Sequence, residues 1–137
     1  MKHLIAAVII LLTACGSSPS ESKTIKDGNW SGTASDSTDI TFTVDGNTIK
    51  NMNFTVEFQM ESAPDTTVTW NFNTDITDNE FQYMDISGEN EWQLGVNMTG
   101  TFDPPDQVSG DLTTWIVYSE GGTETDTLET SWSATPE

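Results

Sequence analysis

From residue 28 onward, apolar and polar side chains alternate with a period of two along most of the chain. Successive side chains of a β-strand point to opposite sides, so this alternation predicts strands with one buried face. No stretch after residue 28 keeps the period of a helix, and the many threonines favour strands. The clearest alternating runs are 40–44, 52–60, 68–72, 92–98, 112–118 and 128–134.

Turn-forming sequences separate these runs. Asp45 and Gly46 together form a strong hairpin signal, and residues 103–106 combine two aspartates with two prolines. The spacing predicts about eight or nine short strands. We therefore expect an all-β domain over residues 28–137, an antiparallel β-sandwich or flattened barrel.

Residues 81–86 depart from the simple alternation. Phe81 and Tyr83 make one face of the predicted strand apolar, and Met84 and Ile86 do the same for the other face. We expect this segment to be buried on both faces or to carry a β-bulge.

Five short motifs occur in a fixed order, at residues 28–32, 40–49, 100–102, 108–112 and 132–134. They read G-x-W-x-G, I-x-F-x-V-x-x-x-x-I, G-x-F, V-x-G-x-L and W-x-A. This order resembles a group of small secreted or lipid-anchored bacterial β-sandwich domains. The resemblance implies the same fold and no particular activity, because none is established for that group.

The first fifteen residues have the form of an export signal. Lys2 precedes an apolar run at residues 4–12, which is shorter than the roughly 20 apolar residues of a membrane-spanning helix. Residues 12–15 read Leu-Thr-Ala-Cys and resemble the lipobox of bacterial lipoproteins. That resemblance implies cleavage between Ala14 and Cys15 and attachment of acyl chains such as palmitate at Cys15. More than one chain gives stable anchoring.

These signals divide the chain into a lipoprotein signal peptide at 1–14, a lipidated Cys15 with a flexible linker at 15–27, and the β domain. We expect the mature protein to be secreted across the cytoplasmic membrane and held in the cell envelope by its lipid. In a Gram-negative host, Gly16 stands where lipoproteins of the inner membrane carry a retaining aspartate. The outer membrane is then favoured.

The chain carries 22 acidic and 4 basic residues, a formal charge of -18. Nucleic-acid binding is excluded, because it needs a basic surface to neutralise phosphates. Cleavage after Ala14 removes His3, the single histidine, and lipidation consumes the single cysteine. Histidine-dependent nucleophilic sites and histidine-ligated zinc are then impossible. We expect a protein that is no enzyme and has no cofactor, with calcium as the one exception discussed below.

Paired carboxylates remain as a possible catalytic device, as in glycoside hydrolases. Glu57, Asp85, Glu91 and Glu129 are predicted on or near strand faces. Among 22 acids, however, chance pairs are expected, and the chain has no arginine to position a substrate.

Calcium is the metal that such a chain favours, since it takes hard oxygen ligands from loops. Asp75, Asp78 and Glu80 place three acids within six residues. Their spacing does not match an EF-hand loop, and acids that merely keep the surface soluble explain the pattern equally.

Trp115 is the candidate for ligand contact. It lies out of phase with Leu112 and Ile116, so it points outward if those residues face the core. An exposed indole offers a flat apolar surface to a sugar ring or to a protein partner. The other four tryptophans are in phase with apolar neighbours and are expected in the core: Trp30, Trp70, Trp92 and Trp132.

The sequence thus predicts a lipid-anchored extracytoplasmic β-sandwich protein with a non-catalytic binding or envelope-supporting role. The alternative is a cell-surface module that binds carbohydrate or calcium, and a carboxylate-dependent hydrolase comes third. The expected partners are the membrane, through the N-terminal lipid, and a glycan or envelope protein.

Overall fold

The computed structural model describes residues 23–61 and 63–137. Within these residues all regular structure is β, and no helix is long and apolar enough to cross a membrane. The all-β prediction is confirmed. The strands are β2 (Gly28–Ala34), β3 (Asp39–Asp45), β4 (Thr48–Phe58), β5 (Thr66–Asp75), β6 (Glu80–Glu89), β7 (Trp92–Asp103), β8 (Gln107–Tyr118) and β9 (Glu124–Pro136).

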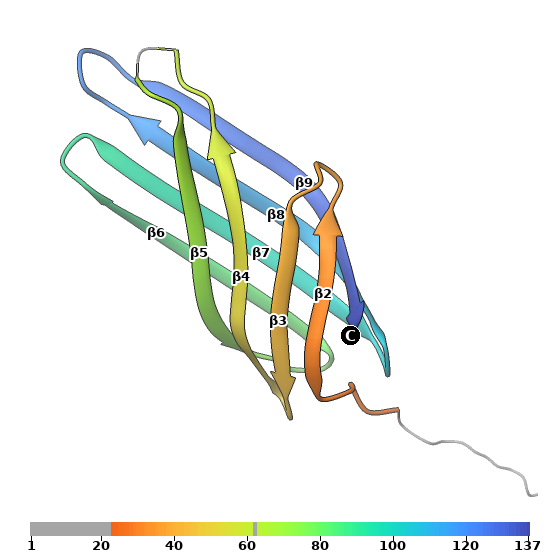
Figure 1. Ribbon diagram of the computed structural model, residues 1–137. Helices are drawn as coiled ribbons and strands as arrows, with labels where there is room; N and C mark the ends of the chain where they lie inside the picture. The colour runs from red at the N-terminus through yellow and green to blue at the C-terminus, as the bar shows by residue number, and fades with distance from the viewer. Residues whose placement is uncertain (1–22, 62) are drawn as a thin grey trace, which may run out of the picture.

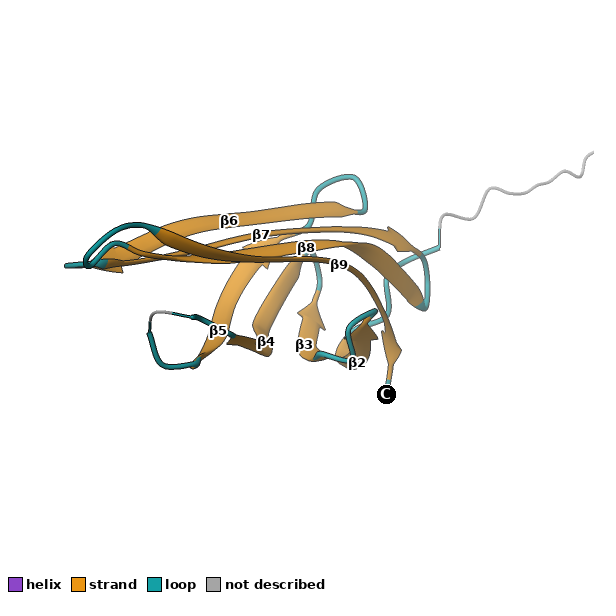
Figure 2. Cartoon of the chain, turned by 90° about the horizontal axis from the view of Figure 1, so that it is seen from above, coloured by secondary structure: helices purple, strands orange, loops and turns teal. Residues whose placement is uncertain are grey.

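The strands form one antiparallel sheet in the order β5-β4-β3-β2-β9-β8-β7-β6. The chain runs up and down through β2 to β5 and again through β6 to β9, and β2 pairs with β9. The sheet curls so that β2–β5 and β6–β9 face each other as two layers (Figures 1 and 2). The fold is therefore a nearly closed, barrel-like sheet, and its free edges are β5 and β6.

A seam runs between the two free edges. Near the short β5–β6 turn the edges are held together by the rings of Phe72 and Tyr83, which stack with centroids 3.7 Å apart and an interplanar angle of 5°. No ladder of backbone hydrogen bonds joins β5 to β6 in the described residues. Figure 1 shows β6 crossing behind β5 and continuing beyond it, and residues 84–89 of β6 are all exposed. The far half of β6 is therefore an uncovered edge.

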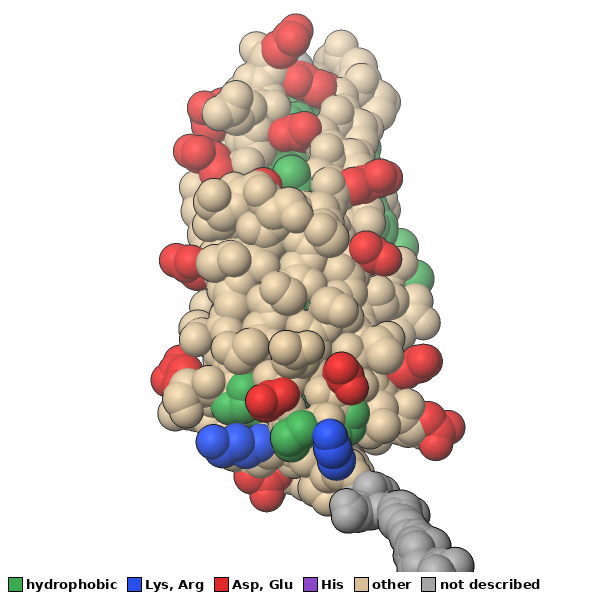
Figure 3. All heavy atoms as spheres, turned by 90° about the vertical axis from the view of Figure 1, so that its right-hand side faces the viewer, with side chains coloured by type: hydrophobic (Ala, Val, Ile, Leu, Met, Phe, Trp, Pro, Cys, Tyr) green, Lys and Arg blue, Asp and Glu red, His purple; other side chains and the backbone are tan. Residues whose placement is uncertain are grey.

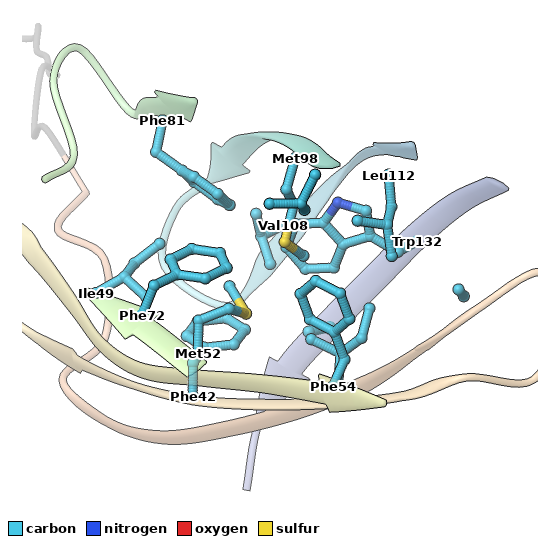
Figure 4. Packing of buried hydrophobic residues seen from close by; sticks show 14 of the residues in the cluster. Phe42, Ile49, Met52, Phe54, Phe72, Phe81, Met98, Val108, Leu112 and Trp132 are labelled. Atoms are coloured by element: carbon cyan, nitrogen blue, oxygen red, sulfur yellow. The ribbon is translucent and has the colours of Figure 1, made fainter. Parts of the chain in front are cut away.

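The core lies between the two layers, where side chains of both converge (Figure 4). Trp30 is fully buried; its ring stacks on Phe42 at 5.8 Å and meets Phe102 edge-on at 5.4 Å. Its indole N–H donates to the Lys26 carbonyl at 2.9 Å. The predicted apolar faces of β3, β4, β7 and β8 all point into this core. The largest fully buried side chains are Trp30, Phe54, Phe58, Ile40, Ile49, Met52, Met98, Leu112, Ile116, Val44, Val96 and Val108.

Two expectations about burial need correction. Residues 81–86 are neither buried on both faces nor bulged: they form part of a regular edge strand, and Met84 and Ile86 are 56% and 55% exposed. At the other end of the domain, Ile25 belongs to the predicted linker but is buried in the core at 7% exposure. The last residues of the linker thus pack on the domain.

Thr114 is a buried polar residue in the otherwise apolar core. It is fully buried on the inner face of β8, and its hydroxyl has no hydrogen-bond partner. An unsatisfied buried hydroxyl destabilises the folded state, and valine has a similar shape without it. We expect Thr114→Val to raise the free energy of unfolding by about 1 kcal/mol in urea titrations. The same change at Thr113, on the outer face, should have little effect; an unchanged or lower stability for Thr114→Val would contradict this assignment.

Candidate functional site

Trp115 lies on the outer face of β8, as the sequence predicts. The register places Ile86, Gly95, Trp115 and Thr127 in one row across β6, β7, β8 and β9. A Cβ atom built on Gly95 would lie 2.0 Å from Cε2 of the Trp115 indole, so the ring lies flat over this glycine. One face of the indole therefore covers the backbone of β7 at Gly95, and the Trp115 side chain as a whole is half-buried. Glycine-covering aromatic rings of this kind also stabilise sheets.

Met84 and Ile86 on β6 continue this surface toward the free edge. They are the large hydrophobic side chains that the structure leaves most exposed, and both point away from the core. Val117 follows Trp115 on the same outer side of β8 and is half-buried. We call these four residues, Met84, Ile86, Trp115 and Val117, the outer patch. It joins an edge strand to the interior of the sheet.

On β6 and β7, the surroundings of the outer patch are polar but uncharged. The outer positions of β6 and β7 from the row of Gln82 to the row of Val117 carry no acidic or basic side chain, whereas Glu129 on β9 lies in the same row as Met84. Beside the patch, a shallow hollow of about 340 Å³ is lined by Ile86, Gly88 and Val117, with Glu89 and Glu91 at the hairpin. Figure 3 shows the contrast on another face, where acidic side chains are spread along the whole length.

The inner side of the same edge strand is acidic. Asp85 and Glu89 point to the inner face of β6, with Ser87 between them, and all three are exposed. Between Met84 and Glu89, β6 therefore presents apolar side chains on its outer side and carboxylates on its inner side. Behind these carboxylates the inner face is partly covered by half-buried apolar residues: Val68, Trp70, Tyr83, Trp92, Leu94, Tyr118 and Leu128.

Tyr118 lies at the hairpin end of this inner face, with its ring 4.4 Å from that of Trp92. Its hydroxyl donates a hydrogen bond to Glu120. This bond, together with desolvation and the negative charges of Glu120 and Glu91, raises the pKa of Tyr118 to about 12. Desolvation and the charge of Asp85 also raise the pKa of Tyr83.

We expect Glu120→Gln to lower the pKa of Tyr118 toward its ordinary value of 10.0. In a Tyr83→Phe background, ultraviolet titration of tyrosinate measures Tyr118 alone. Glu129→Gln is the control, because Glu129 lies on β9 and not in the turn beside Tyr118. Because folding raises this pKa, its stabilising contribution is complete below pH 10.0 and is lost as the pH rises through about 12. A Tyr118 pKa unchanged by Glu120→Gln would contradict the bond.

The acids suggested as calcium ligands are not gathered into a site. Asp75 ends β5, Asp78 lies in the turn with φ of 55°, and Glu80 begins β6. Within residues 23–61 and 63–137, no three acidic, histidine or cysteine side chains form a group that could hold a metal ion. The backbone of this turn instead contacts β7, since the Phe102 N–H donates to the Asn79 carbonyl at 2.7 Å.

The four carboxylates considered for hydrolysis are scattered over the domain. Glu57 lies on β4 and lines a shallow hollow with Asp36 and Asp39, whereas Glu91 lines the hollow beside the outer patch. Asp85 lies on the inner side of β6 and Glu129 on β9. The predicted lipidation site at Cys15 and the cleavage site after Ala14 lie outside the described residues.

Fold and surface together define a class: an all-β, nearly closed antiparallel domain with an uncharged outer patch beside a free strand edge. Comparison with models of protein families, with curated proteins and with solved structures finds no match for the chain. The resemblances to lipoprotein signals and to small β-sandwich domains therefore stay predictions from the motifs quoted above.

Proposed function

We propose that this protein is a lipid-anchored extracytoplasmic domain that binds a partner without catalysing a reaction. The observation that carries the proposal is the outer patch. Met84 and Ile86 are more than half exposed on an edge strand, next to an indole fixed over Gly95. Exposed apolar side chains that adjoin one another, rimmed by polar residues, are typical of interaction surfaces.

The anchoring part of the proposal rests on the lipobox motif at residues 12–15 and on the polar linker that follows it. The described chain enters the domain beside the β7–β8 turn, where the Lys26 N–H donates to the Pro105 carbonyl at 3.0 Å. Lysine side chains gather at this end of the face in Figure 3. The outer patch lies on strands β6 to β8, away from the linker. We propose the cell envelope as its location, and the outer membrane if the host is Gram-negative.

Mass spectrometry of the mature protein tests the anchor. Cleavage before Cys15 and a diacylglyceryl group on its sulfur are the expected result. An unmodified N-terminus at any other residue would overturn the anchoring proposal without affecting the binding surface.

The binding role is tested by NMR with the full chain in neutral detergent micelles. Glycans, with and without calcium, and extended peptides are titrated while backbone shifts are followed. Shifts that concentrate on Met84, Ile86, Trp115 and their neighbours, and that vanish in Trp115→Ala, support the proposal. Thr69→Ala, on the outer face of β5, is the matched control. If no ligand class perturbs the outer patch, the proposal fails.

Carbohydrate binding is the second candidate function, and one observation favours it. The Trp115 ring is held flat with one face against Gly95, so the other face is presented outward beside the amide side chains of Gln93 and Asn97. Flat aromatic faces and amide groups are suited to sugar C–H and hydroxyl groups. A glycan that shifts Trp115 while leaving the backbone of β6 unaffected would support this candidate.

A further inference from the structure

The two unpaired edges of the sheet face one seam, and they differ in character. β5 shows only polar side chains on its outer side, such as Thr67, Thr69 and Asn71. β6 shows Met84 and Ile86 there instead. Natural edge strands are usually protected by lysine, proline, a bulge, inward-pointing charges or a covering segment. Between Met84 and Glu89, the only such protection on β6 is the pair of inward-pointing carboxylates of Asp85 and Glu89, which oppose an acidic added strand but not a basic one. β6 is therefore open to pairing with a strand whose basic side chains meet these two carboxylates.

We infer that β6 accepts an extended peptide strand as an additional strand of the sheet, apolar on one side and basic on the other. This inference rests on the proposed binding function and specifies its partner. In strand addition, backbone hydrogen bonds supply affinity, and alternate side chains supply specificity. The outer patch would contact the apolar side of the added strand, and the carboxylates of β6 would contact its basic side.

The register of the added strand follows from the seam. Phe72 stacks on Tyr83 and closes the seam near the β5–β6 turn, so pairing begins at Met84 and extends to Glu89. The β4–β5 loop, which follows Phe58, does not cover this part of β6. Gln59 N–H donates to Asp126 Oδ2 on β9 at 3.0 Å, so this bond holds the loop toward β9 rather than over β6.

Charge selects the partner. Positions of the added strand opposite Asp85 and Glu89 share the inner side with two carboxylates, and cross-strand pairs of opposite charge are favourable. Lysine or arginine is expected there. Positions opposite Met84 and Ile86 share the outer side, where β-branched or aromatic residues fit.

A second copy of this chain is a poor partner for the same edge. β6 carries Glu80, Asp85 and Glu89 and no basic residue, and each copy has a formal charge of -18. Pairing β6 with itself would bring these like charges together, which opposes association.

Three labelled peptides of about eight residues test the inference, long enough for one strand. One alternates lysine and valine, one has the same residues in two blocks, and one alternates glutamate and valine. Fluorescence anisotropy with the full chain in neutral detergent micelles, at low salt, should show the lysine–valine peptide binding roughly 10-fold more tightly than either of the others. Amide exchange should slow on β6 between Met84 and Glu89 when it binds.

Two substitutions locate the binding. The double change Asp85→Lys and Glu89→Lys should reverse the preference, so that the glutamate–valine peptide binds more tightly. Ile86→Lys should weaken binding, because a lysine blocks the edge and removes part of the outer patch. Thr69→Lys adds the same charge to the other free edge and should have little effect. All four positions are exposed, and circular dichroism verifies that each variant folds.

Several results would overturn the inference: peptide binding without slower exchange on β6, equal effects of Ile86→Lys and Thr69→Lys, no reversal by the double change, or a β6-paired dimer. If no peptide binds but a glycan shifts the outer patch, strand addition fails and the proposed function stands. If no ligand class reaches the patch, both fail.

Discussion

Replacing Trp30 by alanine should lower the free energy of unfolding by about 3–5 kcal/mol, the range for large aromatic residues removed from cores. Trp30 is fully buried, packs against Phe42 and Phe102, and donates its N–H to the Lys26 carbonyl at 2.9 Å. Alanine removes both ring contacts, leaves a cavity between the layers and leaves the Lys26 carbonyl without this donor. The loss is a large fraction of the roughly 5–15 kcal/mol by which a typical domain is stable.

Denaturant unfolding followed by circular dichroism measures this loss, and Trp115→Ala is the matched control. The same chemical change at Trp115 removes a side chain that lies on the outer surface over Gly95. We expect it to cost much less than Trp30→Ala. Equal losses at the two positions would contradict the assignment of Trp30 to the core and Trp115 to the outer patch.

Replacing Gly32 by valine should separate β2 from β9, which is the pairing that joins the two layers. A Cβ atom at Gly32 would lie 1.9 Å from the Ser133 carbonyl oxygen and 2.6 Å from the Cα of Ala134. Both contacts are with backbone, so they are relieved only by moving one strand. We expect a loss of about 3 kcal/mol, at the upper end of the range for overpacked sites.

Thr33→Val is the control for this second prediction, because Thr33 is the next residue of β2 and is exposed. Thermal unfolding of the two variants should show a much lower midpoint for Gly32→Val, together with faster amide exchange along β2 and β9. A Gly32→Val protein as stable as Thr33→Val would mean that β2 and β9 are not paired as closely as the structure has them.

Much of the fold is predictable from the sequence, because the face of a strand is encoded locally. Ile40, Phe42 and Val44 alternate with polar residues and are all buried. The outward direction of Trp115 follows from the same rule, since it is out of phase with Leu112 and Ile116. Both predictions need only the period of a strand and the choice of one face as buried.

The closing of the sheet and the position of its seam depend on long-range pairing, which no local pattern encodes. Gly95 and Trp115 meet only because β7 and β8 pair in one register, so the packing of the indole over Gly95 could not be predicted. Apolar residues on both sides of the segment 81–86 predicted burial, but burial of Met84 and Ile86 would need another layer outside β6, and the described chain supplies none.

β4 contains a β-bulge that the alternation of apolar and polar residues does not predict. Ile49 and Met52 are both fully buried although they are an odd number of residues apart. The register with β5 shifts between them, and Asn51 has a φ of 57°, so a bulge returns the following residues to the inner face. The Asn73 side chain accepts the Asn51 N–H at 2.9 Å and holds the bulge.

The central claim is that β6 has a free edge, available for a partner, beside the outer patch. Residue-resolved amide hydrogen exchange of the full chain, at two protein concentrations, tests it most directly. The structure predicts fast exchange at alternate amides of β6 between Met84 and Glu89, slow exchange throughout the interior strand β8, and no dependence on concentration. Protection along β6 equal to that of β8 would show that the edge is already covered and would contradict the account.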